Sequence, residues 1–304
     1  MSTLSSKWIK AIFFGNYFYG ICAVGLSIEA SLQQEFPLNN ILYYSLVFLS
    51  AVFYYTLAYM GEPPPNAANS RSAWYSLHKK IIKQRQILLA VLIVVLGLVF
   101  LRQIWSHLLQ ASGFSWFLLF IFPAVAAMYY GVNSSRFGGI NLRRIGWLKP
   151  FFIGFTWAGF VTIYPVLLYN IEELRDFDPE FRNWLLFVKN FMFVSVLCIL
   201  FDIKDYATDA NKELKTFVVK TGLRKTIFYI IIPLSAVGLG AFMLYATSHH
   251  FSLFKILLNT IPFILLIAVA YSLSRRRPII YYLAIIDGLM LVKAICGSIA
   301  MVWF

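Results

Sequence analysis

The chain has 304 residues, of which 60% are hydrophobic and 13% are charged. This composition excludes an ordinary soluble globular protein, because a fold of that kind would leave too much apolar surface in water. The net charge of +13 could indicate a nucleic-acid partner, so the positions of the cations along the chain have to be considered before that class is excluded.

Nine apolar runs are long enough to cross a hydrocarbon core, which needs roughly 20 residues. In chain order they cover about 10–28, 39–61, 86–104, 114–131, 150–169, 184–202, 226–246, 254–273 and 279–303. The first run follows Lys7 and Lys10 and lacks a small-residue cleavage site, so we expect a span and not a removed leader. The sequence therefore predicts an all-α integral membrane protein with nine transmembrane helices, in which residues 1–304 form a single domain.

Lysine and arginine concentrate in alternate connections between these runs. The N-terminal tail and the segments after the second, fourth, sixth and eighth runs hold most of the 26 cations. The other connections are acidic or nearly bare of cations, and we assign Glu29, Glu35 and Glu172 to them. By the positive-inside rule, the N-terminus is cytosolic and the C-terminus external in a multi-pass cell-membrane protein. Topology thus accounts for most of the net charge, and we expect no nucleic-acid partner.

Three carboxylates at helical spacing follow the sixth run. Asp202, Asp205 and Asp209 stand at i, i+3 and i+7, which places them on one face of a helix. Three like charges repel one another unless a cation lies between them, and carboxylate oxygens suit Mg²⁺, which completes its shell with water and substrate phosphate. A solvated acidic turn at a membrane edge is the alternative. Six nearby cations favour a metal-bridged diphosphate over that alternative: Lys204, Lys212, Lys215, Lys220, Arg224 and Lys225.

The segment from Asp202 to Gly222 resembles the second aspartate motif of the UbiA-type intramembrane prenyltransferases. The family motif is similar to Asp-Ile-x-Asp-Tyr-x-x-Asp followed by Lys, by Lys/Arg-Thr and by Gly. The matching residues here are Asp202-Ile203-Lys204-Asp205-Tyr206-Ala207-Thr208-Asp209, Lys212, Lys215-Thr216 and Gly222. Residues 142–149 and Trp157-Ala158 also resemble the family's basic connection and the start of its fifth helix. The resemblance implies a nine-helix bundle with two acidic motifs that hold Mg²⁺ against a prenyl diphosphate.

The first acidic motif of the family is degenerate in this chain. The family has an Asn and one or two Asp near the cytosolic end of the second helix, where this chain reads Tyr55-Thr56-Leu57-Ala58-Tyr59-Met60-Gly61-Glu62. Glu62 is the only carboxylate of that region, so it is the candidate metal ligand there. The nearest other polar residues are Asn66, Asn69, Arg71 and His78. The chain is therefore similar to a divergent member of the family.

The resemblance implies roles for the individual site residues. Asp202, Asp205 and Asp209 are the candidate catalytic residues and metal ligands. The candidate diphosphate-binding residues are Lys212, Arg143, Arg144 and Tyr130. Asn16 and Tyr55 are candidates for the substrate cavity. Other readings stay open, because paired arginines and an interfacial tyrosine also serve as headgroup anchors, and an intramembrane Asn more often bonds another helix.

The expected function is Mg²⁺-dependent transfer of a prenyl group from a prenyl diphosphate to an aromatic, quinone-precursor or other lipophilic acceptor within the membrane. One alternative is a non-catalytic relative that binds or transports an isoprenoid lipid. A structural or partner-binding protein with a vestigial Asp202 segment is the other. Outside this site, Asp287 and Lys293 lie six residues apart in the last run, so we expect each to meet another helix instead of forming a direct pair.

Overall fold

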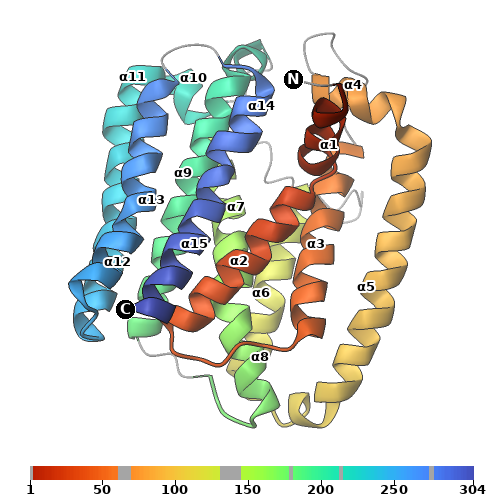
Figure 1. The fold of residues 1–304 in the computed structure, drawn as a ribbon, viewed down its shortest axis with the longest axis vertical. Helices are drawn as coiled ribbons and strands as arrows, with labels where there is room; N and C mark the ends of the chain where they lie inside the picture. The colour runs from red at the N-terminus through yellow and green to blue at the C-terminus, as the bar shows by residue number, and fades with distance from the viewer. Residues whose placement is uncertain (1–2, 61–69, 131–144, 178–180, 212–214, 274–276) are drawn as a thin grey trace. The chain divides into compact units, whose positions relative to one another are not determined.

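The computed structural model describes residues 3–60, 70–130, 145–177, 181–211, 215–273 and 277–304, and every regular element among them is a helix (Figure 1). The N-terminal part comprises α1 (Thr3–Phe14), α2 (Tyr17–Gln33), α3 (Ile41–Met60), α4 (Ser70–Leu77), α5 (Lys79–Leu108) and α6 (Gly113–Tyr130). The middle comprises α7 (Lys149–Ala158), η3 (Gly159–Ile163), α8 (Tyr164–Glu172) and α9 (Phe181–Asn211). The C-terminal part comprises α10 (Phe217–Thr221), α11 (Leu223–Thr226), η4 (Ile227–Ile231), α12 (Ile232–Ser248), α13 (Leu253–Ser272), α14 (Ile279–Tyr281), η5 (Tyr282–Ile286) and α15 (Gly288–Trp303).

The described helices bear out most of the predicted spans. Seven helical stretches are long and apolar enough to cross a membrane: 41–60, 79–108, 149–172, 184–204, 223–248, 253–272 and 279–303. Each lies over one predicted run, and the bent pair α1 and α2 would be an eighth span. Helix α6 has 18 residues and is about 27 Å long, slightly short of a ~30 Å hydrocarbon core. The all-α membrane fold is confirmed, whereas the count of nine spans stays a prediction.

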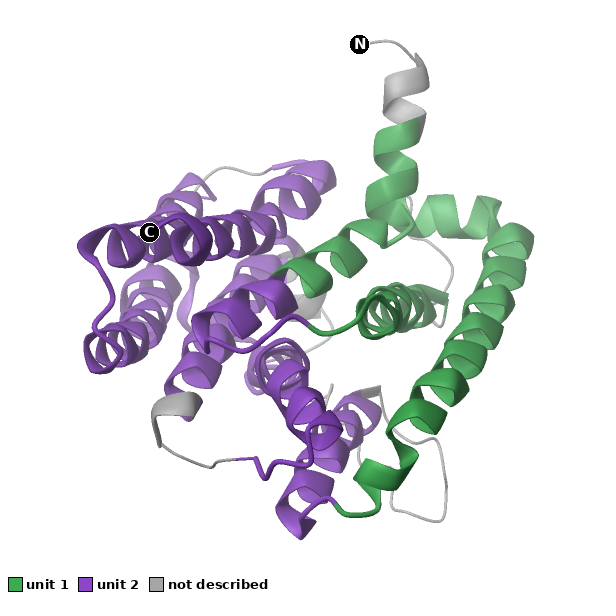
Figure 2. Cartoon of the chain, turned by 60° about the horizontal axis from the view of Figure 1, so that its bottom comes forward, with its two compact units in different colours: residues 1–25, 39–110 green, residues 26–38, 111–304 purple. Residues whose placement is uncertain are grey.

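The chain forms two compact units, coloured separately in Figure 2. Unit 1 contains residues 1–25 and 39–110, and unit 2 contains residues 26–38 and 111–304. Helix α2 therefore contributes its first part to unit 1 and its second part to unit 2. The assignment of residues 1–304 to a single domain stays a prediction.

The first predicted span, over residues 10–28, contains a bend, and whether it crosses the membrane as one span stays a prediction. The chain bends by 61° between α1 and α2, at Gly15 and Asn16. Asn16 has a φ of 65°, a left-handed conformation that Asn tolerates better than most residues. A Cβ on Gly15 would lie 2.2 Å from the carbonyl oxygen of Ala11, so only glycine fits before the bend. These two residues turn one apolar run into two helices.

Two of the membrane-spanning helices contain a π-helical turn directly before a proline. Pro165 and Pro233 each stand two residues after a π-helical segment, η3 and η4 respectively. A proline ring clashes with the carbonyl four residues earlier in an α-helix, and here that carbonyl lies inside the wider π turn. The π segments thus let these spans carry a proline and continue.

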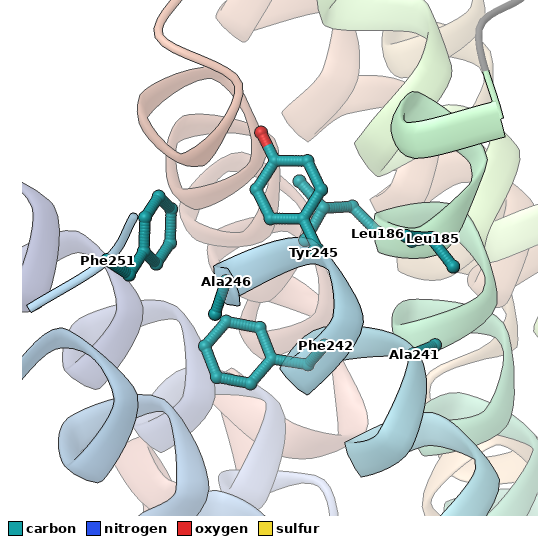
Figure 3. Close-up of a cluster of buried hydrophobic side chains, with 7 residues drawn as sticks. All are labelled: Leu185, Leu186, Ala241, Phe242, Tyr245, Ala246 and Phe251. Atoms are coloured by element: carbon teal, nitrogen blue, oxygen red, sulfur yellow. The ribbon is translucent and has the colours of Figure 1, made fainter. Parts of the chain in front are cut away.

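In unit 2, α9 packs along both α7 and α12, and α13 packs along α15. Small residues bring these helices close together. A Cβ on Gly154 of α7 would lie 2.2 Å from Ser195 Oγ of α9, and one on Gly238 of α12 would lie 3.0 Å from Met192 Cβ. Figure 3 shows the adjoining apolar cluster of α9, α12 and the connection after α12, which is made of Leu185, Leu186, Ala241, Phe242, Tyr245, Ala246 and Phe251. This packing fixes α9, the helix that carries the predicted aspartates.

Candidate functional site

The three predicted aspartates lie on one uninterrupted helix. Helix α9 runs from Phe181 to Asn211, so positions 202, 205 and 209 keep the helical spacing that places them on a common face. The apolar part of α9 ends near Ile203, and the acidic positions therefore follow directly after the membrane-spanning stretch 184–204. The local geometry expected from the sequence is present in the backbone, while the roles of these residues stay predictions.

Asp202 forms an ion pair with Lys149, the first residue of α7. Lys149 Nζ donates a hydrogen bond to Asp202 Oδ1 at 2.9 Å. The Asp202 side chain is 2% exposed and that of Lys149 is 28% exposed. A buried carboxylate needs a cation or several hydrogen bonds, and Lys149 supplies such a partner from 53 residues earlier in the chain.

The two segments that carried the family resemblance are in contact within unit 2. Besides the ion pair, Gly146 packs against the backbone that precedes α10: a Cβ there would lie 2.9 Å from the carbonyl carbon of Lys215 and 3.0 Å from the amide nitrogen of Thr216. Thr216 Oγ1 caps α10 by accepting a hydrogen bond from the amide of Val219 at 3.4 Å. Gly222 ends α10 with a φ of 78°, a conformation that favours glycine. The motif thus folds as a helix end followed by a capped turn.

Several predicted site residues lie outside what the structure describes. Glu62, Arg143, Arg144 and Lys212 are outside the described ranges. The backbones of Tyr130, Asp205 and Asp209 belong to α6 and α9, but their side chains are likewise outside the description. Within the described residues, no three His, Cys, Asp or Glu side chains come together as a metal site. Of the predicted Mg²⁺ ligands only Asp202 can be judged, and its Oδ1 is engaged by Lys149.

Asn16 links helices within unit 1. Its Nδ2 donates to Thr56 Oγ1 at 3.0 Å and to the Tyr75 hydroxyl at 2.9 Å, and its Oδ1 accepts a hydrogen bond from Arg71 Nη2. Burial raises the pKa of Tyr75, which keeps the phenol a hydrogen-bond donor, here to the carbonyl of Phe14 at 3.0 Å. The expected interhelical role of Asn16 is confirmed, and its place in a substrate cavity stays a prediction.

Tyr55, the other predicted cavity residue, lies on α3 in the same unit. Its ring stacks on that of Tyr19, with centroids 4.0 Å apart and planes inclined by 9°. The Arg71 guanidinium lies 3.7 Å from the centroid of the Tyr59 ring and is 1% exposed. Unit 1 therefore encloses an arginine among aromatic rings and neutral polar groups, close to the degenerate first motif.

A buried charge cluster in unit 2 was missed. We call it the Glu29 cluster, and it consists of Glu29, Gln33, Lys189, Asn259 and Lys293. The assignment of Glu29 to an external acidic connection was wrong, because it lies inside α2 and is 0% exposed. Lys189 lies on α9, Asn259 on α13 and Lys293 on α15, so the cluster connects four helices. The confirmed part of the prediction is that Lys293 meets another helix.

The hydrogen bonds of the Glu29 cluster differ between its two lysines. Lys189 Nζ donates to Glu29 Oε1 at 3.0 Å, to Gln33 Oε1 at 2.9 Å and to Asn259 Oδ1 at 3.2 Å. Three acceptors match the three N–H bonds of an ammonium. Lys293 Nζ contacts Glu29 Oε2 at 2.5 Å. Two lysines and one carboxylate are thus buried together at membrane depth, where each charge needs a partner.

The signal that could have revealed this cluster was the presence of Glu29, Lys189 and Lys293 in or beside apolar runs. A charge at such a position is rare unless it is paired or functional. Sequence spacing gave no indication of the pairing, because Lys189 and Lys293 lie 160 and 264 residues from Glu29.

Comparison with known proteins gives one informative similarity. No protein-family model and no curated protein matches the sequence. The chain is similar to a solved structure of digeranylgeranylglyceryl phosphate synthase, with 12% sequence identity and a TM-score of 0.54. The match covers 99% of this chain and 100% of that chain. The chain has the fold of a UbiA-type intramembrane prenyltransferase.

This result confirms the fold expected from the Asp202–Gly222 segment. The UbiA-type fold and the apolar helices together make the chain an integral membrane protein. At 12% identity the likeness concerns the fold alone.

Proposed function

We propose that this UbiA-like protein transfers a prenyl group from a prenyl diphosphate to a lipophilic acceptor within the membrane, with Mg²⁺ as cofactor. The observation that carries the proposal is the aspartate motif on the end of α9, in contact with the start of α7, in a chain of this fold. Aromatic rings, quinone precursors and other membrane lipids are the acceptor classes. The N-terminus and the motif face the cytosol, where water-soluble diphosphates are available, and the C-terminus is external.

Ionisation of a prenyl diphosphate explains why carboxylates and cationic side chains occur together at this site. Ionisation of an allylic diphosphate builds negative charge on the leaving pyrophosphate. Asp205 and Asp209 would hold Mg²⁺, which would supply Lewis-acid neutralisation of that charge when bound. Lys212, with Arg143 and Arg144, holds the diphosphate by charge-assisted hydrogen bonds and keeps it oriented. Apolar helices exclude water from the reactive carbon, so that the acceptor and not water receives the prenyl group.

The test measures pyrophosphate release by the purified protein. A panel of geranyl, farnesyl and geranylgeranyl diphosphates is supplied with a membrane lipid extract as the acceptor source, with Mg²⁺ or with EDTA. We expect release that requires Mg²⁺ and falls at least about 100-fold in Asp205→Asn and in Asp209→Asn. Glu35→Gln, which alters an exposed carboxylate, serves as the matched control. Absence of release by the wild type, with every donor, would refute the proposed reaction.

A second function is favoured by the degenerate first motif. Glu62 is the only carboxylate in residues 1–25 and 39–110, so unit 1 offers at most one acidic ligand. A chain that binds or carries an isoprenoid lipid without reacting needs no second acidic motif. In that case the prenyl diphosphate binds to the purified protein and is recovered unchanged. For a structural or partner-binding protein with a vestigial Asp202 segment, Asp205→Asn and Asp209→Asn leave the cellular role intact.

A further inference from the structure

We propose that Asp202 is a positioning residue for Lys149 and not a metal ligand, and that Lys149 binds a phosphate oxygen of the prenyl diphosphate. This assignment rests on the proposed function and deepens it. It divides the aspartate motif into two parts: Asp205 and Asp209 remain for the cation, whereas Asp202 serves a lysine from another helix.

The exposed fractions of Asp202 and Lys149 indicate which residue of the pair positions the other and which one contacts the ligand. Asp202 is almost fully buried, while Lys149 keeps 28% of its side chain exposed. A residue that holds another is expected to be the enclosed member of the pair, and a residue that meets a ligand is expected to be the accessible one. The 2.9 Å hydrogen bond then fixes the position of the lysine ammonium.

The ion pair also makes Asp202 a poor ligand for Mg²⁺. A carboxylate oxygen that already accepts from an ammonium has lost much of its attraction for a dication. A dication bound to the same carboxylate would lie within a few ångströms of the lysine charge and repel it. Mg²⁺ usually takes only one or two protein carboxylates, and Asp205 with Asp209 already meets that number.

The backbone around Lys149 is held in place as well. Lys149 begins α7, and Pro150 fixes the backbone at the helix start. Gly146 packs directly against Lys215 and Thr216, so the preceding turn has little room to move. A lysine on such a turn loses less conformational entropy on binding a phosphate than a lysine on a free loop. These constraints suit a preorganised phosphate contact.

A double-mutant cycle tests the assignment, with Lys149→Met, Asp202→Asn and the double variant. Affinity for geranylgeranyl diphosphate is measured at saturating Mg²⁺ without acceptor, from the ligand-induced shift in melting temperature. We expect each single variant to lose roughly tenfold to a hundredfold in affinity. The double variant should be no weaker than Lys149→Met, because Asp202 acts only through the lysine. Lys149→Arg should retain part of the affinity, and Lys80→Met, an exposed cation of α5, is the matched control.

The Mg²⁺ dependence of pyrophosphate release separates the two roles of the aspartates. Asp202→Asn should leave the half-saturating Mg²⁺ concentration within about twofold of wild type, whereas Asp209→Asn should raise it by tenfold or more. A rise in Asp202→Asn as large as that in Asp209→Asn would overturn the positioning role. Unchanged diphosphate affinity in Lys149→Met would overturn the phosphate contact.

Separate controls distinguish loss of folding, failure of this assignment and failure of the proposed function. The double variant removes both charges of the pair, so it should fold even if Lys149→Met, which removes the lysine partner of a buried carboxylate, is unstable. A wild type that releases pyrophosphate while Lys149→Arg and the double variant bind as tightly as wild type overturns this assignment alone. A wild type that neither binds nor releases overturns the proposed function, and this assignment with it.

Discussion

Replacement of Glu29 by Gln should be among the most destabilising isosteric changes in unit 2. Glu29 accepts hydrogen bonds from Lys189 at 3.0 Å and from Gln33 at 3.0 Å, and its other oxygen contacts Lys293 at 2.5 Å. Gln has nearly the same size, so the change removes charge and leaves the packing intact. Two buried lysines then lack the only carboxylate that contacts them among the described residues.

Two estimates of the cost agree. Removing one partner of a buried ion pair costs ~3–5 kcal/mol in other proteins. Alternatively, one lysine can enter the folded state as a neutral amine, and removing its proton at pH 7 from an ordinary pKa near 10.4 costs about 4.6 kcal/mol. Since whole domains have stabilities of roughly 5–15 kcal/mol, either value would remove a large share of the free energy of unfolding.

The assay is an SDS titration of the protein in mixed micelles, which gives the free energy of unfolding for wild type, Glu29→Gln and Glu35→Gln. Glu35 is exposed, so its substitution by Gln should change the free energy by less than ~0.5 kcal/mol. A Glu29→Gln variant that unfolds within ~1 kcal/mol of wild type would refute the view that the charge of this carboxylate stabilises the buried lysines.

The same titration tests three further substitutions. Lys189→Met should cost ~2 kcal/mol more than Lys293→Met, because Lys189 donates to three described acceptors and Lys293 to one; equal costs would contradict this. Gly297→Ala should cost ~1–3 kcal/mol, since its Cβ would lie 2.5 Å from the buried carboxylate, while Gly97→Ala, in open space, should be neutral or stabilising by up to ~1 kcal/mol. Asn16→Ala should cost ~1 kcal/mol more than Asn16→Gly, because both lose the same hydrogen bonds but only alanine is strained at a φ of 65°; a smaller loss for alanine would contradict this.

The spans could be predicted from the sequence because hydropathy is a local property. Each of the seven described spans coincides with a predicted run to within a few residues at most ends, and the largest difference is the N-terminal extension of α5, which begins at Lys79. The bend at Asn16 could not be predicted in the same way. A polar residue in an apolar run is compatible with an unbroken helix, and the left-handed backbone is stabilised by Thr56 and Tyr75 from α3 and α4.

For the candidate site, the placement of the three aspartates on one helix was predictable for the same reason, and their roles stay predictions. The spacing of Asp202, Asp205 and Asp209 is local, so a single helix delivers it. The pairing of Asp202 with Lys149 is tertiary, because it depends on α7 packing along α9. The sequence identified Lys149 only as part of a basic connection, and nothing in the spacing gave its partner. Glu29 was misplaced for the corresponding reason: a window average hides one charge, and its partners lie on distant helices.

Helix α9 carries two buried charged residues in unit 2, Lys189 and Asp202, and the exposure of their partners distinguishes their roles. Lys189 and Asp202 lie 13 positions apart on it, about 20 Å along the helix axis. Lys189 is fully enclosed with its acceptors, and its hydrogen bonds connect α9 to α2 and α13. Asp202 is equally enclosed, but its partner Lys149 extends to the surface. A closed cluster stabilises the bundle, whereas a buried acid that supports an accessible lysine suits a site that receives an anion. Experiments should therefore distinguish the two roles. Glu29→Gln should mainly lower the free energy of unfolding, whereas Lys149→Arg should mainly lower the affinity for the diphosphate.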